Sequence, residues 1–142
     1  MRLTRIAAAL LALGMASTWG NGYAADKADF GKHEYERKCA VCHGLEGRGN
    51  GAMAAVLKTR VSNLTYLSKN NNGVFPVKRV YETIDGTEVL PAHGTRDMPI
   101  WGTVYREEIG ESQTHVYDEV APAYVRAQIL ALIDYINRLQ AK

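Results

Sequence analysis

A run of five residues, Cys39-Ala40-Val41-Cys42-His43, constrains this chain more than any other feature. Cys-x-x-Cys followed directly by His is the sequence signature of covalent c-type haem attachment. On a helix the two thiols lie at i and i+3 and the imidazole at i+4, so all three project from one face. The motif therefore predicts thioether bonds from Cys39 and Cys42 to one haem c, with His43 as an axial ligand of the iron.

Two other chemistries use a Cys-x-x-Cys pair, namely a thiol–disulfide redox centre and one half of a zinc site. A zinc site takes four ligands, and the two cysteines of the motif are the only ones in the chain. A thioredoxin-like centre belongs to βαβ units, and the sequence shows no strand alternation. Haem attachment is therefore the preferred interpretation, and it leaves no cysteine for a structural disulfide.

The N-terminus has the pattern of a secretory signal peptide. Two arginines precede the apolar run 6–16, and small residues stand at −3 and −1 if cleavage follows Ala24. The run is shorter than the roughly 20 apolar residues that span a bilayer, so we expect no stable membrane insertion after cleavage. The expected organisation is a signal peptide over 1–24 and one periplasmic domain over 25–142.

The expected mature chain carries no net charge. The sequence has 17 basic and 15 acidic residues, and without Arg2 and Arg5 of the signal peptide 15 of each remain. This balance argues against binding to nucleic acid and against a partner found mainly through overall charge. Any charged docking surface must be local; the acidic stretch over 103–121 is expected to be a solvated loop or, alternatively, a docking surface for a basic partner.

The expected fold class is all-α, with short helices and long loops. The clearest amphipathic pattern lies in the last helix, where apolar residues recur at steps of three and four: Val125, Ile129, Leu132, Ile133, Ile136 and Leu139. A first helix is expected to run from Asp26 and Asp29, which supply capping and first-turn acids, to about the cysteine motif. Other helices are expected over 52–58, over 64–69, and between Pro76 and Gly86, with Pro122 opening the last. The glycine-rich segment 44–51 predicts a flexible bend beside the haem, and residues 86–101 predict a long loop over a haem face.

Met98 is the candidate for the second axial ligand. It follows His43 by 55 residues, and Pro99 restricts its backbone to an extended conformation that suits a ligand carried by a loop. A methionine also serves as core filler, which is the interpretation preferred for Met53. His93, in the same loop as Met98, is the rival ligand.

With these residues in place, the mature chain resembles the class I cytochromes c, and more narrowly the small bacterial monohaem members with a Met-Pro-x-Trp-Gly ligand loop, here Met98–Gly102. Gly31 and Tyr35 stand where this family places a glycine and an aromatic on its N-terminal helix. Leu132 and Tyr135 resemble the Leu-x-x-aromatic of its C-terminal helix. The resemblance implies a cytochrome c-like fold, in which these two helices cross and short helices and long loops surround one covalent haem.

The chain departs from the family after the haem motif. Family members commonly have a proline there whose carbonyl accepts a hydrogen bond from the proximal imidazole, and none occurs between His43 and Pro76. A backbone carbonyl within 60–64 is expected to take this role. Trp101 is a candidate for packing on the haem edge or donating to a propionate, and packing in the core is the alternative. Two arginines, Arg48 and Arg96, are candidates for neutralising the propionates.

A His/Met-ligated iron leaves no position for a substrate, so we expect a one-electron carrier rather than an enzyme. Its donor and acceptor would be redox proteins that the sequence does not identify. A haem subunit of a periplasmic dehydrogenase or sulfur-oxidising complex would carry the same motifs. The remaining alternative is an open-site haem enzyme or gas sensor, in which Met98 does not bind iron and His93 supplies an acid–base group.

Overall fold

The computed structural model describes residues 29–87, 97–110 and 117–141, and the segment 1–24 assigned to a signal peptide lies outside these ranges. The described residues form helices, turns and loops without strands, which confirms the all-α prediction. No helix among them is long and apolar enough to cross a membrane. The elements are α1 (Phe30–Lys38), α2 (Ala40–His43), the 3₁₀ turns η1 (Leu64–Tyr66) and η2 (Lys69–Asn71), α3 (Val77–Asp85), α4 (Trp101–Gly110) and α5 (Tyr117–Arg138).

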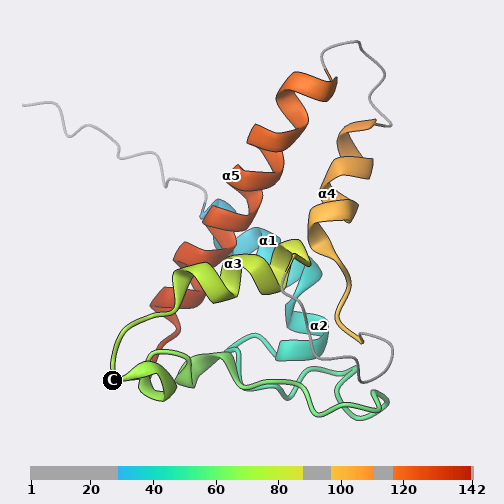
Figure 1. The fold of residues 1–142 in the computed structure, drawn as a ribbon. Helices are drawn as coiled ribbons and strands as arrows, with labels where there is room; N and C mark the ends of the chain where they lie inside the picture. Colours follow the sequence, from blue (N-terminus) through green and yellow to red (C-terminus); the bar gives the residue numbers. More distant parts are fainter. Residues whose placement is uncertain (1–28, 88–96, 111–116, 142) are drawn as a thin grey trace, which may run out of the picture.

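Helix α5 is the centre of the fold, because α1, α3 and α4 all pack against it (Figure 1). Its predicted apolar stripe faces this packing: five of the six residues, from Val125 to Ile136, are buried, and Leu139 is partly buried against them. The chain between α2 and α3 forms a separate layer of loops, which runs along the lower edge of Figure 1. Helices and loops thus occupy different parts of the molecule.

Helices α1 and α5 approach each other most closely at Gly31. A Cβ atom at Gly31 would collide with the backbone carbonyl of Ala131, so only glycine permits this approach. One turn further along α1, the ring of Tyr35 lies 5.1 Å from that of Tyr135 at a tilt of 51°. The glycine and the aromatic pair noted in the sequence therefore meet across these two helices.

We expect Gly31→Ala to lower the free energy of unfolding by about 2 kcal/mol or more, because the added methyl group meets backbone that cannot rotate away. The sign of the change in unfolding free energy is informative, since Gly→Ala inside an unobstructed helix is stabilising. Denaturant unfolding followed by circular dichroism measures the change. His33→Ala, on the exposed side of α1, is the matched control and should change stability by less than about 0.5 kcal/mol. Equal stability of the two variants would contradict the close approach.

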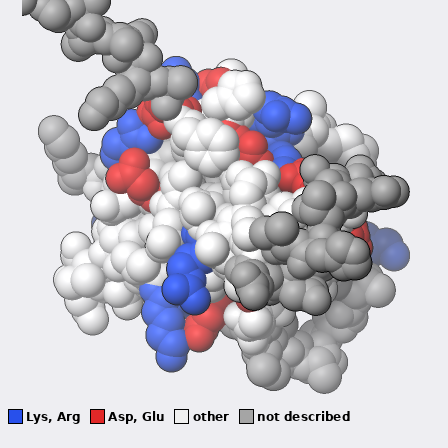
Figure 2. Space-filling view, turned by 90° about the horizontal axis from the view of Figure 1, so that it is seen from above, with Lys and Arg blue, Asp and Glu red and all other residues white. Residues whose placement is uncertain are grey.

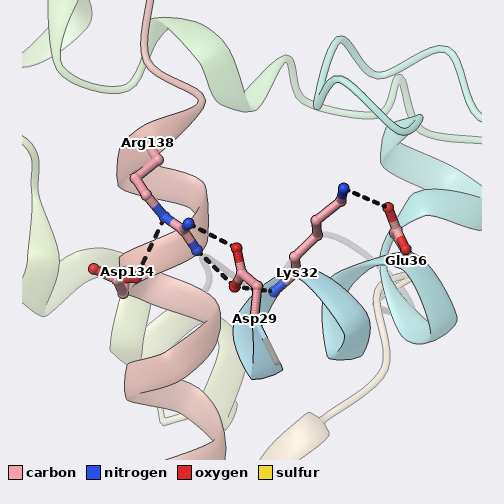
Figure 3. A network of polar contacts seen from close by, with 5 residues as sticks. All are labelled: Asp29, Lys32, Glu36, Asp134 and Arg138. Atoms are coloured by element: carbon pink, nitrogen blue, oxygen red, sulfur yellow. Dashed lines mark hydrogen bonds and ion pairs between the residues drawn. The ribbon is translucent and has the colours of Figure 1, made fainter. Parts of the chain in front are cut away.

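A salt bridge joins the start of α1 to the end of α5 (Figure 3). Arg138 donates from Nη1 and Nη2 to the two oxygens of Asp29, at 2.7 and 2.8 Å. Asp29 also caps α1, as predicted, by accepting the N–H of Lys32 at 3.0 Å. The hydrogen bonds from Arg138 and Lys32 lower the pKa of Asp29 to about 2.

The lowered pKa of Asp29 predicts an acid-dependent loss of stability. Because its pKa is lower in the folded than in the unfolded chain, its contribution is present above about pH 4 and is lost as the pH falls through about 2. The melting temperature of the wild type should therefore exceed that of Asp29→Asn near pH 5, and the difference should shrink towards pH 2. Asp134→Asn, which removes the other carboxylate near Arg138, is the control. If the difference in melting temperature between wild type and Asp29→Asn did not depend on pH, the lowered pKa of Asp29 would be contradicted.

Four helix predictions are wrong. Residues 52–58 form turns, because Met53 and Val56 are 45% and 70% exposed and so short a helix is not stable without packing. Residues 101–110, expected as loop, form α4, whose Tyr105 is fully buried. Helix α5 begins at Tyr117 rather than at Pro122, since burial of residues such as Ala121 extends it past the proline. The helix expected over 64–69 is reduced to the turn η1, and η2 follows it.

Candidate haem site

The cysteine motif forms the helical turn that follows α1. The N–H groups of Cys42 and His43 both donate to the carbonyl of Cys39, at 3.1 and 2.9 Å. Ala40, between the cysteines, is buried in the core and holds this turn against the helices. Cys39, Cys42 and His43 themselves are half-buried. The structure therefore places the two thiols and the imidazole on one helical turn, as predicted.

The ring of His43 is oriented by a backbone carbonyl. Its Nδ1 lies 3.0 Å from the carbonyl oxygen of Ser62, and because a carbonyl can only accept, Nδ1 is the donor. A neutral ring then carries its lone pair on Nε2, the atom left for a metal ion. Burial lowers the pKa of His43, and this favours the neutral ring. The hydrogen bond to Ser62 acts in the opposite direction but is the smaller effect. Ser62 lies within the segment 60–64 that the sequence indicated.

The environment of Cys39 does not suit a reactive thiol. Burial, and next the negative charge of Glu34, raise the pKa of Cys39 to about 12. Redox-active cysteines have lowered pKa values, because the thiolate is the nucleophile. In the described part of the chain both cysteines are free, and no three Cys, His, Asp or Glu side chains come together as ligands of one metal ion.

The glycine-rich bend after the motif is held in a defined shape. The N–H of Gly49 donates to the carbonyl of His43, and the N–H of Leu64 donates to the carbonyl of Gly47, both at 2.7 Å. Gly49 has a φ of +76°, and a Cβ atom there would lie 2.6 Å from the carbonyl oxygen of Val61. The bend, predicted to be flexible, is therefore packed against the same segment that orients His43.

The segment that carries Met98 is held on both sides. Before it, Asp97 Oδ2 accepts the N–H of Thr59 at 3.1 Å. After it, Gly102 lies so close to Asp85 that a Cβ atom would collide with the Asp85 side chain. Met98 itself is half-buried against the hydrophobic core. Its role as an iron ligand stays a prediction, as does that of His93, which lies outside the described residues.

The loop layer lacks a core of its own. Every residue from 44 to 76 is described, and no apolar side chain among them is fully buried, although Leu64, Leu67 and Phe75 are partly buried against the helical core. Five of the large hydrophobic side chains in this segment are exposed: Leu45, Met53, Val56, Tyr66 and Val74. Ordered loops normally pack some of their apolar side chains, because ordering the backbone costs about 1–2 kcal/mol per residue. The loop layer therefore fits a large apolar group that packs beside the Cys39–His43 turn.

The other residues singled out from the sequence have mixed outcomes. Met53 is 45% exposed, so its interpretation as packing is wrong. Arg48 pairs with Glu46 at 2.8 Å on the surface, whereas Arg96 lies outside the described residues. Trp101 is half-buried, with its ring 6.2 Å from that of Tyr105.

A charged cluster between α1 and α4 was missed. The ammonium group of Lys38 binds Glu34 at 2.8 Å and Glu108 at 2.6 Å, and Tyr105 donates to Glu34 at 3.1 Å. The Glu34–Lys38 spacing of four residues was a visible signal, but the pairing with Glu108 required the fold. Glu108 of the acidic stretch is thus engaged internally. Figure 2 shows positive and negative side chains interspersed over the coloured part of the face seen from above.

Comparisons of the chain with protein-family models, with curated proteins and with solved structures found no match.

Proposed function

We propose that this chain is a periplasmic class I c-type cytochrome, a one-electron carrier with one covalent haem c and a cytochrome c-like fold. The observation that carries the proposal is the half-buried Cys39–His43 turn, with Nε2 of His43 left for iron, next to a loop layer without fully buried apolar side chains. The proposal includes cleavage of a signal peptide after Ala24 and a mature chain that is not inserted in a membrane. Its partners are redox proteins.

Bound haem would supply a one-electron couple, Fe(III)/Fe(II). The chain would hold it through the sulfur atoms of Cys39 and Cys42 and through Nε2 of His43. The carbonyl of Ser62 fixes the tautomer and orientation of the imidazole and makes it a better electron donor. A thioether ligand from Met98 favours the reduced state and raises the reduction potential. If apolar side chains of the loop layer packed around the haem, they would exclude water from the iron, which would raise the potential further.

Electron transfer is favoured over catalysis because a His/Met-ligated iron has no open position. A haem subunit of a periplasmic dehydrogenase or sulfur-oxidising complex would show the same site, and co-purification with a second protein would support that role. An open-site enzyme or gas sensor requires Met98 to be displaced from the iron, and spectroscopy distinguishes this case directly.

The first experiment is a visible and near-infrared spectrum of the protein, produced with its leader in cells that carry a haem-attachment system. We expect haem that stays on the chain under denaturing conditions, a low-spin oxidised spectrum, and the weak sulfur-to-iron charge-transfer band of methionine ligation. A high-spin spectrum would favour the open-site enzyme or sensor. Absence of covalent haem would overturn the proposal.

A further inference from the structure

We propose that Asp97 is a positioning residue for Met98, and that it acts through a strap, residues 59–62, which also orients His43. The inference rests on the proposed function, since it concerns the two residues proposed as axial ligands. It assigns a role to Asp97 and Thr59, which no sequence motif singled out.

Two hydrogen bonds at the ends of the strap carry the inference. At one end the N–H of Thr59 donates to Asp97 Oδ2 at 3.1 Å, directly before Met98. At the other end the carbonyl of Ser62 accepts from His43 Nδ1 at 3.0 Å. Because a residue spans at most about 3.6 Å, the four residues of the strap keep these two points within roughly 14 Å of each other.

The strap is itself fixed, so it can serve as a common reference for both ligand segments. Two residues after its end, the N–H of Leu64 donates to the carbonyl of Gly47 at 2.7 Å. Within it, the carbonyl of Val61 packs against Gly49 more closely than any other residue would allow at that position. A displacement of the strap would therefore disturb the glycine-rich bend that continues from the haem motif.

The tether matters because a thioether is a weak, neutral ligand whose hold on iron depends on how often the loop brings the sulfur to it. Fixing the residue before Met98 lowers the conformational entropy that the loop loses when the sulfur binds iron. The effective concentration of the sulfur at the iron is therefore higher. A carboxylate is a stronger acceptor for this purpose than a neutral group. Without the tether, an external ligand competes more successfully for the same position.

The test measures imidazole binding to the oxidised holoprotein, with the near-infrared charge-transfer band as the second readout. Asp97→Ala removes the acceptor, and Thr59→Pro removes the donor from the other side of the same bond. We expect both variants to bind imidazole about tenfold more tightly, because a tenfold change corresponds to the loss of one charge-assisted hydrogen bond. Both should also show a weaker charge-transfer band. Asp97→Asn keeps an acceptor oxygen and should stay closer to the wild type.

Asp134→Ala, which removes an exposed carboxylate from α5, is the matched control and should leave both readouts unchanged. If the wild type shows the band but Asp97→Ala binds imidazole as the wild type does, this inference is overturned and the proposed function stands, even if the variant melts at a lower temperature. If Asp97→Asn behaves like Asp97→Ala, charge rather than the tether is responsible and the inference is also overturned. A wild type without the band would overturn Met98 ligation itself.

Discussion

In a Cys39→Ser/Cys42→Ser variant we expect the loop layer, residues 44–76, to lose most of its structure together with the proposed haem. The helices bury apolar side chains fully against one another, whereas in the loop layer Leu64, Leu67 and Phe75 are only partly buried against that core and no apolar side chain is fully buried. We therefore expect the order of the loop layer to depend on the proposed haem more than that of the helices does. Hydrogen–deuterium exchange should show amides of the loop layer exchanging on the order of 100-fold faster than in the holoprotein, with a smaller change in α1 and α5.

The appropriate control for that experiment is a variant that keeps the haem but loses a comparable amount of stability, and Gly31→Ala serves this purpose. Its added methyl group acts at the contact of α1 with α5, so faster exchange should spread through the helices rather than concentrate in the loop layer. Undiminished protection of the loop layer in the serine variant would show that its exposed apolar side chains do not depend on haem. The fit between site and cofactor would then be wrong.

The parts of the molecule that sequence reasoning predicted are those specified by local patterns. The stripe from Val125 to Ile136 is buried, because five apolar residues on one face of a helix are removed from water when that face packs against the core. Pro76 and Gly86 flank α3 as expected, with Gly86 at a φ of +91°. The cysteine motif lies on one helical turn, and an imidazole partner lies within 60–64.

The errors arise where contacts distant in sequence decide the outcome. The segment 52–58 has a helical composition but nothing to pack against, so it remains in turns. Helix α4 packs against α5 and α3, with Gly102 close to Asp85 of α3 and with the buried Tyr105 bound to Glu34 of α1, contacts that its own short pattern did not reveal. The bond between Thr59 and Asp97 spans 38 residues and joins two segments without regular structure. No periodicity could have indicated it.

Met98→Ala should open a coordination position on the iron and lower the reduction potential. Removing the thioether would take away the proposed ligand that stabilises the reduced state, and a shift on the order of 0.1 V is expected within the roughly 0.8 V range that axial ligands span. The near-infrared charge-transfer band should disappear, and the oxidised protein should bind imidazole or cyanide without displacing a protein ligand. Potentiometric titration and ligand titration of the holoprotein measure these effects.

Met53→Ala is the matched control for this last experiment, because Met53 is an exposed methionine of the loop layer and should change neither the potential nor ligand binding. His93→Ala distinguishes the rival ligand, since it should leave the charge-transfer band in place. If the wild type lacks the band, Met98→Ala leaves the potential unchanged and His93→Ala opens the iron, the axial ligand is His93. Asp97 would then position a segment that does not bind the iron, and the explanation for its bond to Thr59 would be structural alone.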